Sequence, residues 1–210
     1  MKLPTIQINL KDKSILTLIA VNVFPIIGVF FLGWDIFEVV TLYVLETFII
    51  GLFNIFKMFF VKDGGKPFLI PFFFIHYNGF ILIQSVFVLI LIGGEIDDTG
   101  LLTEGTIDNL YFTFTNRDFI IAILLIIFSR GVSFFRNFIK QREFENVKLG
   151  NLMFAPYKRI FIQQLMVIVG AIIVILFDAP MGLLIILIIL KTFLDLRAHS
   201  KSHTPAKETK

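Results

Sequence analysis

Apolar runs of about 20 residues recur along this chain, separated by polar breaks, and we count six of them. A helix needs about that length to cross a hydrocarbon core of about 30 Å. The chain is also poorly suited to face water, because 57% of its residues are hydrophobic, 27 are Phe and only 17% are charged. We therefore predict an all-α polytopic membrane protein, a bundle of six transmembrane helices.

Turn signals and polar clusters bound the expected helices. The helices comprise residues 14–33, 36–61, 68–93, 118–139, 159–177 and 181–197, within a transmembrane domain of residues 14–199. Residues 1–13 and 200–210 form an N-terminal and a C-terminal tail. The longest connection, residues 94–117, is expected to be a polar loop whose Tyr111, Phe112 and Phe114 meet the lipid headgroups.

Lys and Arg are distributed unevenly among the connections. They gather before the first run, between the second and third, between the fourth and fifth, and after the sixth, whereas the alternate connections are acidic apart from Arg117. Segments on the cytoplasmic side of a membrane carry an excess of Lys and Arg. Both termini are therefore expected in the cytoplasm, and the protein in the cell membrane. The net charge of +3 follows from this topology and does not indicate nucleic-acid binding.

The second run carries a polar stripe. Asp35, Glu46 and Lys57 are eleven residues apart, so each lies only about 20° around the helix from the one before. Tyr43 and Asn54 fall on the same side. A bare carboxylate facing lipid costs at least about 2 to 3 kcal/mol, so Glu46 should face the bundle, where it is paired, protonated or hydrated.

Other polar side chains fall inside the remaining runs and complete a predicted cavity. The expected cavity residues are Tyr43, Glu46, Asn54, His76, Arg130, Ser133, Gln164, Lys191 and Asp195. Arg130 either supplies a buried counter-charge to Glu46, or extends toward the cytoplasmic interface or pairs locally, and we favour the second interpretation. His76 is as readily explained by packing as by proton transfer or ligation.

The last run ends in a pattern that suits a metal ion. Asp195, His199 and His203 are four residues apart, so three ligands for a divalent cation would lie on consecutive turns if the helix continues. A solvated helix end, with cationic side chains near the terminal carbonyls, explains the same residues without a metal. The absence of Cys excludes disulfides, thiolate catalysis and Cys-bound metals.

Several stretches resemble an uncharacterised, mostly prokaryotic integral-membrane family recorded only as a domain of unknown function. They are "YVLET", "HYNGF", "SRGVSF", "PYKRI" and "KTFLDLRAH". The resemblance implies a set of recurrent polar positions, namely Tyr43, Glu46, Asn54, Lys57, His76, Ser133, Asn137, Lys191, Asp195 and His199. It also implies His at three positions where this chain has Gln84, Arg130 and Gln164, so a histidine-built metal or haem site lacks ligands here.

Three hypotheses about function follow. The first is an inward cavity, open to the cytoplasm, that binds or transports an ion, a proton or a small polar solute, with Glu46 as its deepest charge. The second is a membrane enzyme using a divalent metal with His76, Asp195 and His199, although no catalytic motif is present and "GVSF" lacks the second glycine of a nucleophile elbow. The third is a scaffold, which a dry and fully paired Glu46 would favour. Gly51, Gly79 and Gly170 permit close helix approach within a subunit or in a homo-oligomer.

Overall fold

The computed structural model describes residues 24–90, 104–161, 163–165 and 168. Within these ranges the chain is helical and contains no strand. The all-α prediction is therefore confirmed for the part of the chain that is described. The expected sixth helix at residues 181–197, most of the fifth, and the beginning of the first lie outside it.

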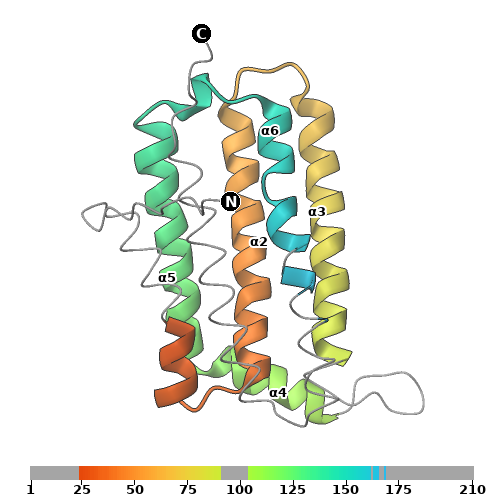
Figure 1. The fold of residues 1–210 in the computed structure, drawn as a ribbon, viewed down its shortest axis with the longest axis vertical. Helices are drawn as coiled ribbons and strands as arrows, with labels where there is room; N and C mark the ends of the chain where they lie inside the picture. The colour runs from red at the N-terminus through yellow and green to blue at the C-terminus, as the bar shows by residue number, and fades with distance from the viewer. Residues whose placement is uncertain (1–23, 91–103, 162, 166–167, 169–210) are drawn as a thin grey trace, which may run out of the picture.

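Three long helices form the body of the molecule, and they run side by side with their axes close to parallel (Figure 1). Helix α2 spans Ile36–Phe60, α3 spans Lys66–Val88 and α5 spans Arg117–Ser133. Helix α2 lies between the other two and is the most buried of the three. Its central position places the polar stripe predicted for residues 36–61 where several elements can reach it.

The sequence determines sharply where α2 begins. Asp35 accepts hydrogen bonds from the backbone N–H groups of Phe37 and Glu38 at 2.8 and 3.1 Å. In return, the Glu38 carboxylate accepts a hydrogen bond of 2.7 Å from the Asp35 N–H. This capping box satisfies N–H groups that have no partner within the helix, and it fixes the first turn.

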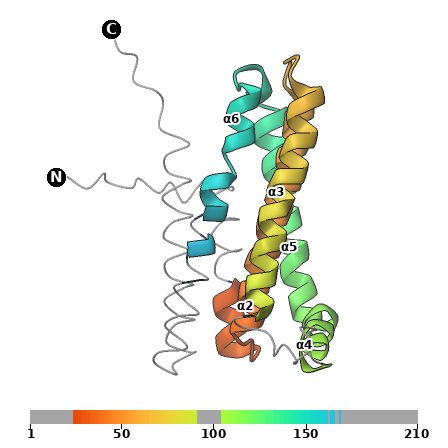
Figure 2. The same ribbon diagram turned by 90° about the vertical axis from the view of Figure 1, so that its right-hand side faces the viewer.

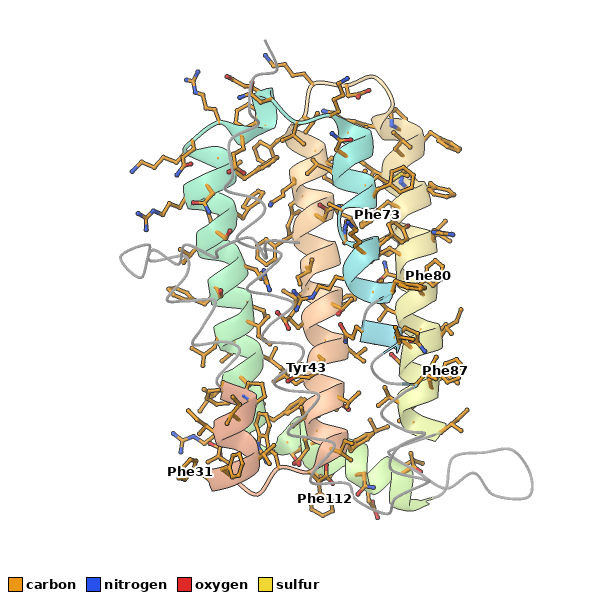
Figure 3. The ribbon with its side chains drawn as sticks, in the orientation of Figure 1. Phe31, Tyr43, Phe73, Phe80, Phe87 and Phe112 are labelled. Atoms are coloured by element: carbon orange, nitrogen blue, oxygen red, sulfur yellow. The ribbon has the colours of Figure 1, made fainter. Side chains whose placement is uncertain are left out.

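The connection predicted as a polar loop at residues 94–117 contains a helix. Helix α4 spans Glu104–Thr115 and lies across the ends of the long helices, at the end where α2 begins (Figures 1 and 2). Tyr111, Phe112 and Phe114 are exposed on it, and Phe112 lies at the extreme end of the molecule (Figure 3). The prediction of a loop was wrong. It relied on the Asp, Thr and Gly residues of this stretch and gave too little weight to the helical spacing of its apolar residues.

Helix α5 does not end at Ser133 but changes its winding. Residues Phe134–Ile139 continue it as a π-helix, η2, in which the Lys140 N–H donates to the Phe135 carbonyl oxygen, five residues back, at 3.0 Å. Together they form a span of Arg117–Ile139, within one residue of the predicted 118–139. A 3₁₀ turn, η3, follows at Glu143–Glu145.

The chain returns to the bundle earlier than we predicted. Helix α6, Leu149–Phe154, packs between α2 and α3, and Leu149, Leu152 and Met153 are buried in the core (Figure 1). We had assigned these residues to a basic cytoplasmic segment and expected the fifth helix only from residue 159. Pro156 interrupts the apolar pattern, so the short helix before it did not stand out from the sequence.

The three long helices have the length and composition of membrane spans. Their outward faces are apolar, with large exposed side chains such as Phe74 on α3 and Phe128 on α5. Continuous apolar surface of this kind is rare on a monomeric soluble protein and is expected of helices that face lipid. The fold therefore defines an all-helical protein with three candidate membrane-spanning helices in its described part.

Candidate functional site

A buried ion-pair cluster lies at the middle of α2, around the carboxylate of Glu46. Glu46 is 1% exposed, and each of its two oxygens contacts a guanidinium. Arg130 Nη2 lies 2.7 Å from Oε1, and Arg159 Nη2 lies 2.7 Å from Oε2. We call these three residues the arginine–glutamate triad. It confirms that Glu46 faces inward.

Three different elements bring the triad together. Glu46 comes from α2, Arg130 from the last turn of α5, and Arg159 from the helical segment that begins after Pro156. The Arg159 N–H donates to the Pro156 carbonyl oxygen at 3.1 Å, so the proline starts the turn that carries Arg159. The Ile160 N–H also donates to the Pro156 carbonyl oxygen, at 3.2 Å, so Pro156 stands immediately before the first helical residue.

The ion pair decides between our two interpretations of Arg130. We favoured a side chain that extends toward the cytoplasmic interface, and this was wrong, because Arg130 is the counter-charge to Glu46. Arg159 was not among the predicted site residues at all. We had counted it with the cytoplasmic cations, since it stands at the start of an apolar run.

A hydrogen-bonded layer lies beside the triad and is centred on Thr47, the residue that follows Glu46 in α2. The Tyr77 hydroxyl donates to the Thr47 carbonyl oxygen at 2.9 Å, and Thr47 Oγ1 lies 2.9 Å from the Tyr43 carbonyl oxygen. Thr47 Oγ1 also contacts the side-chain amide of Gln163. A hydroxyl carries one hydrogen, so Thr47 donates either to the Tyr43 carbonyl oxygen or to Gln163 Oε1, and the buried Gln163 Nε2 has no hydrogen-bond partner among the described residues. This layer links α2 to α3 and to the segment carrying Arg159.

The other predicted residues of α2 are buried but engaged elsewhere. Tyr43 is 5% exposed and packs in a cluster with Trp34 and Phe119. Asn54 donates from Nδ2 to the Leu152 carbonyl oxygen at 2.8 Å, which fastens α6 to α2. Asn54 therefore has a structural partner two turns away from the triad.

His76 lies on the exposed side of α3 and not beside Glu46. Its Nδ1 is 3.0 Å from the Tyr157 hydroxyl, and its ring stacks on Phe72 and meets the edge of Phe80. We had expected His76 and Glu46 to line the same cavity. In the structure His76 lies on the exposed face of α3, whereas Glu46 is buried in the triad.

The remaining predicted residues are scattered or lie beyond the described part. Ser133 is half-buried at the end of α5, and Gln164 lines an apolar pocket of about 380 Å³ with Phe80, Tyr157 and Phe161. Lys191, Asp195, His199 and His203 lie outside the described residues, so the predicted metal ligands stay a prediction. Among the described residues no three His, Asp or Glu side chains are grouped as a metal site would require.

Several buried side-chain atoms of the described residues have no hydrogen-bond partner, and Gln84 is the side chain that contributes two of them. Gln84 is fully buried, and neither its amide nitrogen nor its amide oxygen is bonded. It lies seven residues after Tyr77, hence on the same inward face of α3 and about 10.5 Å further along the axis. Buried amides are nearly always hydrogen-bonded, so Gln84 is an exception within the described part of the bundle.

These features define an all-helical protein of apolar helices around a buried ion-pair cluster. The chain belongs to DUF6498, a family of unknown function whose model matches residues 6–210, and this confirms the expected membership of an uncharacterised family. No curated protein and no solved structure gives a significant match.

Proposed function

We propose that this protein is a multi-pass protein of the cell membrane that binds a small anion at the arginine–glutamate triad. The three apolar helices support the membrane assignment. The six apolar runs and the alternation of basic and acidic connections support six crossings with both termini in the cytoplasm.

The charge of the triad is the observation that carries this proposal. Two guanidiniums contact one carboxylate, so the formal charges of these three side chains sum to +1. Such a charge is costly away from water, and ionisable residues inside membrane spans are characteristic of ion or substrate sites. A bound anion would offset this charge and would accept hydrogen bonds from guanidinium N–H groups.

The same geometry disfavours a cation or an exchangeable proton at Glu46, which was our expectation from sequence. Each carboxylate oxygen already accepts from an arginine at 2.7 Å. A metal ion would have to displace both arginines, and it would add positive charge to side chains whose formal charges already sum to +1. An anion would neither displace the arginines nor add positive charge.

The arginines are open enough to receive a ligand. The side chains of Arg130 and Arg159 are 24% and 21% exposed, whereas Glu46 is 1% exposed. Glu46 thus holds the guanidiniums from the buried side and leaves part of each accessible.

Anion binding is tested by measuring the melting temperature of the purified protein in chloride, nitrate, sulfate and phosphate, with gluconate as the reference anion. We expect at least one anion to raise the melting temperature of the wild type, because a ligand that binds only the folded state stabilises it. Arg159→Gln should abolish this rise, because it removes one of the two guanidiniums and leaves the Glu46–Arg130 pair. Arg142→Gln, which removes an exposed arginine outside the triad, should retain it.

A structural lock between helices is the second candidate, and the complete pairing of Glu46 favours it. In that case no anion shifts the melting temperature. A triple variant Glu46→Leu, Arg130→Met, Arg159→Met would then fold at least as stably as the wild type, because apolar replacement of a buried ion-pair cluster is often neutral or stabilising. Anion flux through liposomes containing the wild type would separate transport from binding alone.

A further inference from the structure

An open groove of about 690 Å³ runs along the outer side of α5 and η2. Its walls are apolar and include Phe53 from α2 together with Ile127, Phe128, Val132 and Phe135. Two cations, Arg136 and Lys140, complete the lining. The groove contains no residue of the triad, so it is a separate feature of the molecule.

The two cations stand at one end of the groove, where the span ends. Ile139 is the last residue of the candidate membrane span, so Lys140 lies just beyond it and Arg136 one turn inside. Both side chains are exposed, and neither forms an ion pair with a described residue. Their long side chains can hold the charge at the height of lipid headgroups while their stems lie against the apolar wall.

The π-helix aligns these cations with the apolar wall. Phe128, Val132, Arg136 and Lys140 are four residues apart, and in an α-helix each step of four overshoots a full turn by about 40°. In a π-turn, closed from residue i to residue i+5, four residues fall short of a full turn instead. The change of winding at Phe134–Ile139 therefore offsets the angular overshoot that accumulates along α5. As a result, Lys140 stays on the side of the helix that lines the groove.

We propose that this groove binds an anionic phospholipid, with one acyl chain against the apolar wall and the phosphate between Arg136 and Lys140. The apolar walls require a ligand with a hydrocarbon part, and the unpaired cations at the membrane boundary require a negative headgroup. A volume of about 690 Å³ is that of a typical ligand pocket. Basic pockets beside transmembrane helices are known to recognise anionic headgroups in this way.

The first test compares phosphatidylglycerol with phosphatidylcholine by native mass spectrometry of the full-length protein in mild detergent. We expect the wild type to retain phosphatidylglycerol preferentially. The double variant Arg136→Gln, Lys140→Gln should bind it roughly 10- to 30-fold more weakly, since each cation near the surface contributes a factor of several. The double variant Lys62→Gln, Lys148→Gln removes two exposed cations outside the groove and should bind like the wild type.

The second test separates a whole lipid from a free phosphate. A Cβ on Gly131 would lie 3.8 Å from Phe53 Cζ, so the substitution Gly131→Leu fits at the backbone and places its remaining atoms in the groove. It should remove phosphatidylglycerol although both cations are intact. Circular dichroism and gel filtration establish that each variant is folded.

Three outcomes would overturn the proposal. The first is equal retention of phosphatidylglycerol and phosphatidylcholine by the wild type. The second is unchanged phosphatidylglycerol binding in the Arg136 and Lys140 double variant. The third is binding of inorganic phosphate that competes with the lipid and is unaffected by Gly131→Leu, which would identify a soluble anion as the ligand.

Discussion

Gly51 of α2 lies directly under the ring of Tyr77 of α3. A Cβ on Gly51 would be 2.7 Å from Tyr77 Cδ1 and closer still to Cε1, a distance that packed carbon atoms do not reach. The tyrosine ring occupies the space that a side chain would need, and its hydroxyl reaches the Thr47 carbonyl oxygen one turn away. The two helices therefore approach closely at the level of the triad because position 51 lacks a side chain.

Replacing Gly51 by Ala should destabilise the protein by about 1 to 3 kcal/mol, because either the ring or the helix must move. The matched control is Gly79→Ala on α3, where nothing lies within 4 Å of a Cβ. That change should be neutral or stabilise by up to about 1 kcal/mol through helix propensity. Thermal unfolding in detergent measures both, and equal effects of the two substitutions would contradict the close approach.

Removing the Asn54 amide should loosen α6 from α2. Asn54→Ala leaves the buried Leu152 carbonyl oxygen without its donor, at an expected cost of about 1 to 3 kcal/mol. Asn78→Ala is the control, because that amide donates to the Phe74 carbonyl oxygen of its own helix at an exposed position. Hydrogen exchange should show faster opening of Leu149–Phe154 in the Asn54 variant alone.

The Asp35 side chain should stabilise the first turn of α2 independently of any function. Asp35→Ala removes two N-cap hydrogen bonds and should lower the free energy of unfolding by about 1 kcal/mol. Asp35→Asn keeps an oxygen acceptor at the same place and should recover most of that loss. An unchanged free energy of unfolding in Asp35→Ala would show that the cap contributes nothing.

The triad should show strong coupling between its members. Glu46→Gln alone leaves two partly buried guanidiniums facing a neutral amide and should cost up to about 3 kcal/mol, the lower end of the range for breaking a fully buried pair. A double-mutant cycle with Arg130→Met should return a coupling energy of about 0.5 to 3 kcal/mol, because the two side chains are in direct contact. A cycle of Glu46→Gln with Arg142→Gln should return close to zero, since Arg142 pairs with Glu145.

The inward position of Glu46 was predictable because burial in lipid without a partner is costly and the stripe on α2 points one way. Its partners were harder to predict. The periodicity of a sequence predicts which face of one helix a residue occupies. It does not predict which residues of other helices lie at the same level along the bundle axis. Arg159 shows this, because its place at the start of an apolar run fitted a cytoplasmic cation as well as a buried one.

His76 shows the opposite error. A single histidine within an apolar span suggested an inward polar group, yet it pairs with Tyr157 on the outer side of α3. Tyr77, its neighbour in sequence, takes the inward position and reaches α2. The spacing of Phe73, Tyr77, Ile81 and Gln84 marks the buried face of α3 and was the signal that could have distinguished the two residues.

The distances along the chain within the triad have a consequence for biosynthesis. Arg130 is synthesised 84 residues after Glu46. At about 5 to 20 residues per second, the ribosome needs roughly 4 to 17 s to deliver it, and longer for Arg159. During that interval the carboxylate of α2 has neither arginine available, although a charge at the bilayer centre costs a few kcal/mol. Release of α2 from the insertion machinery is therefore expected to wait until α5 has been made.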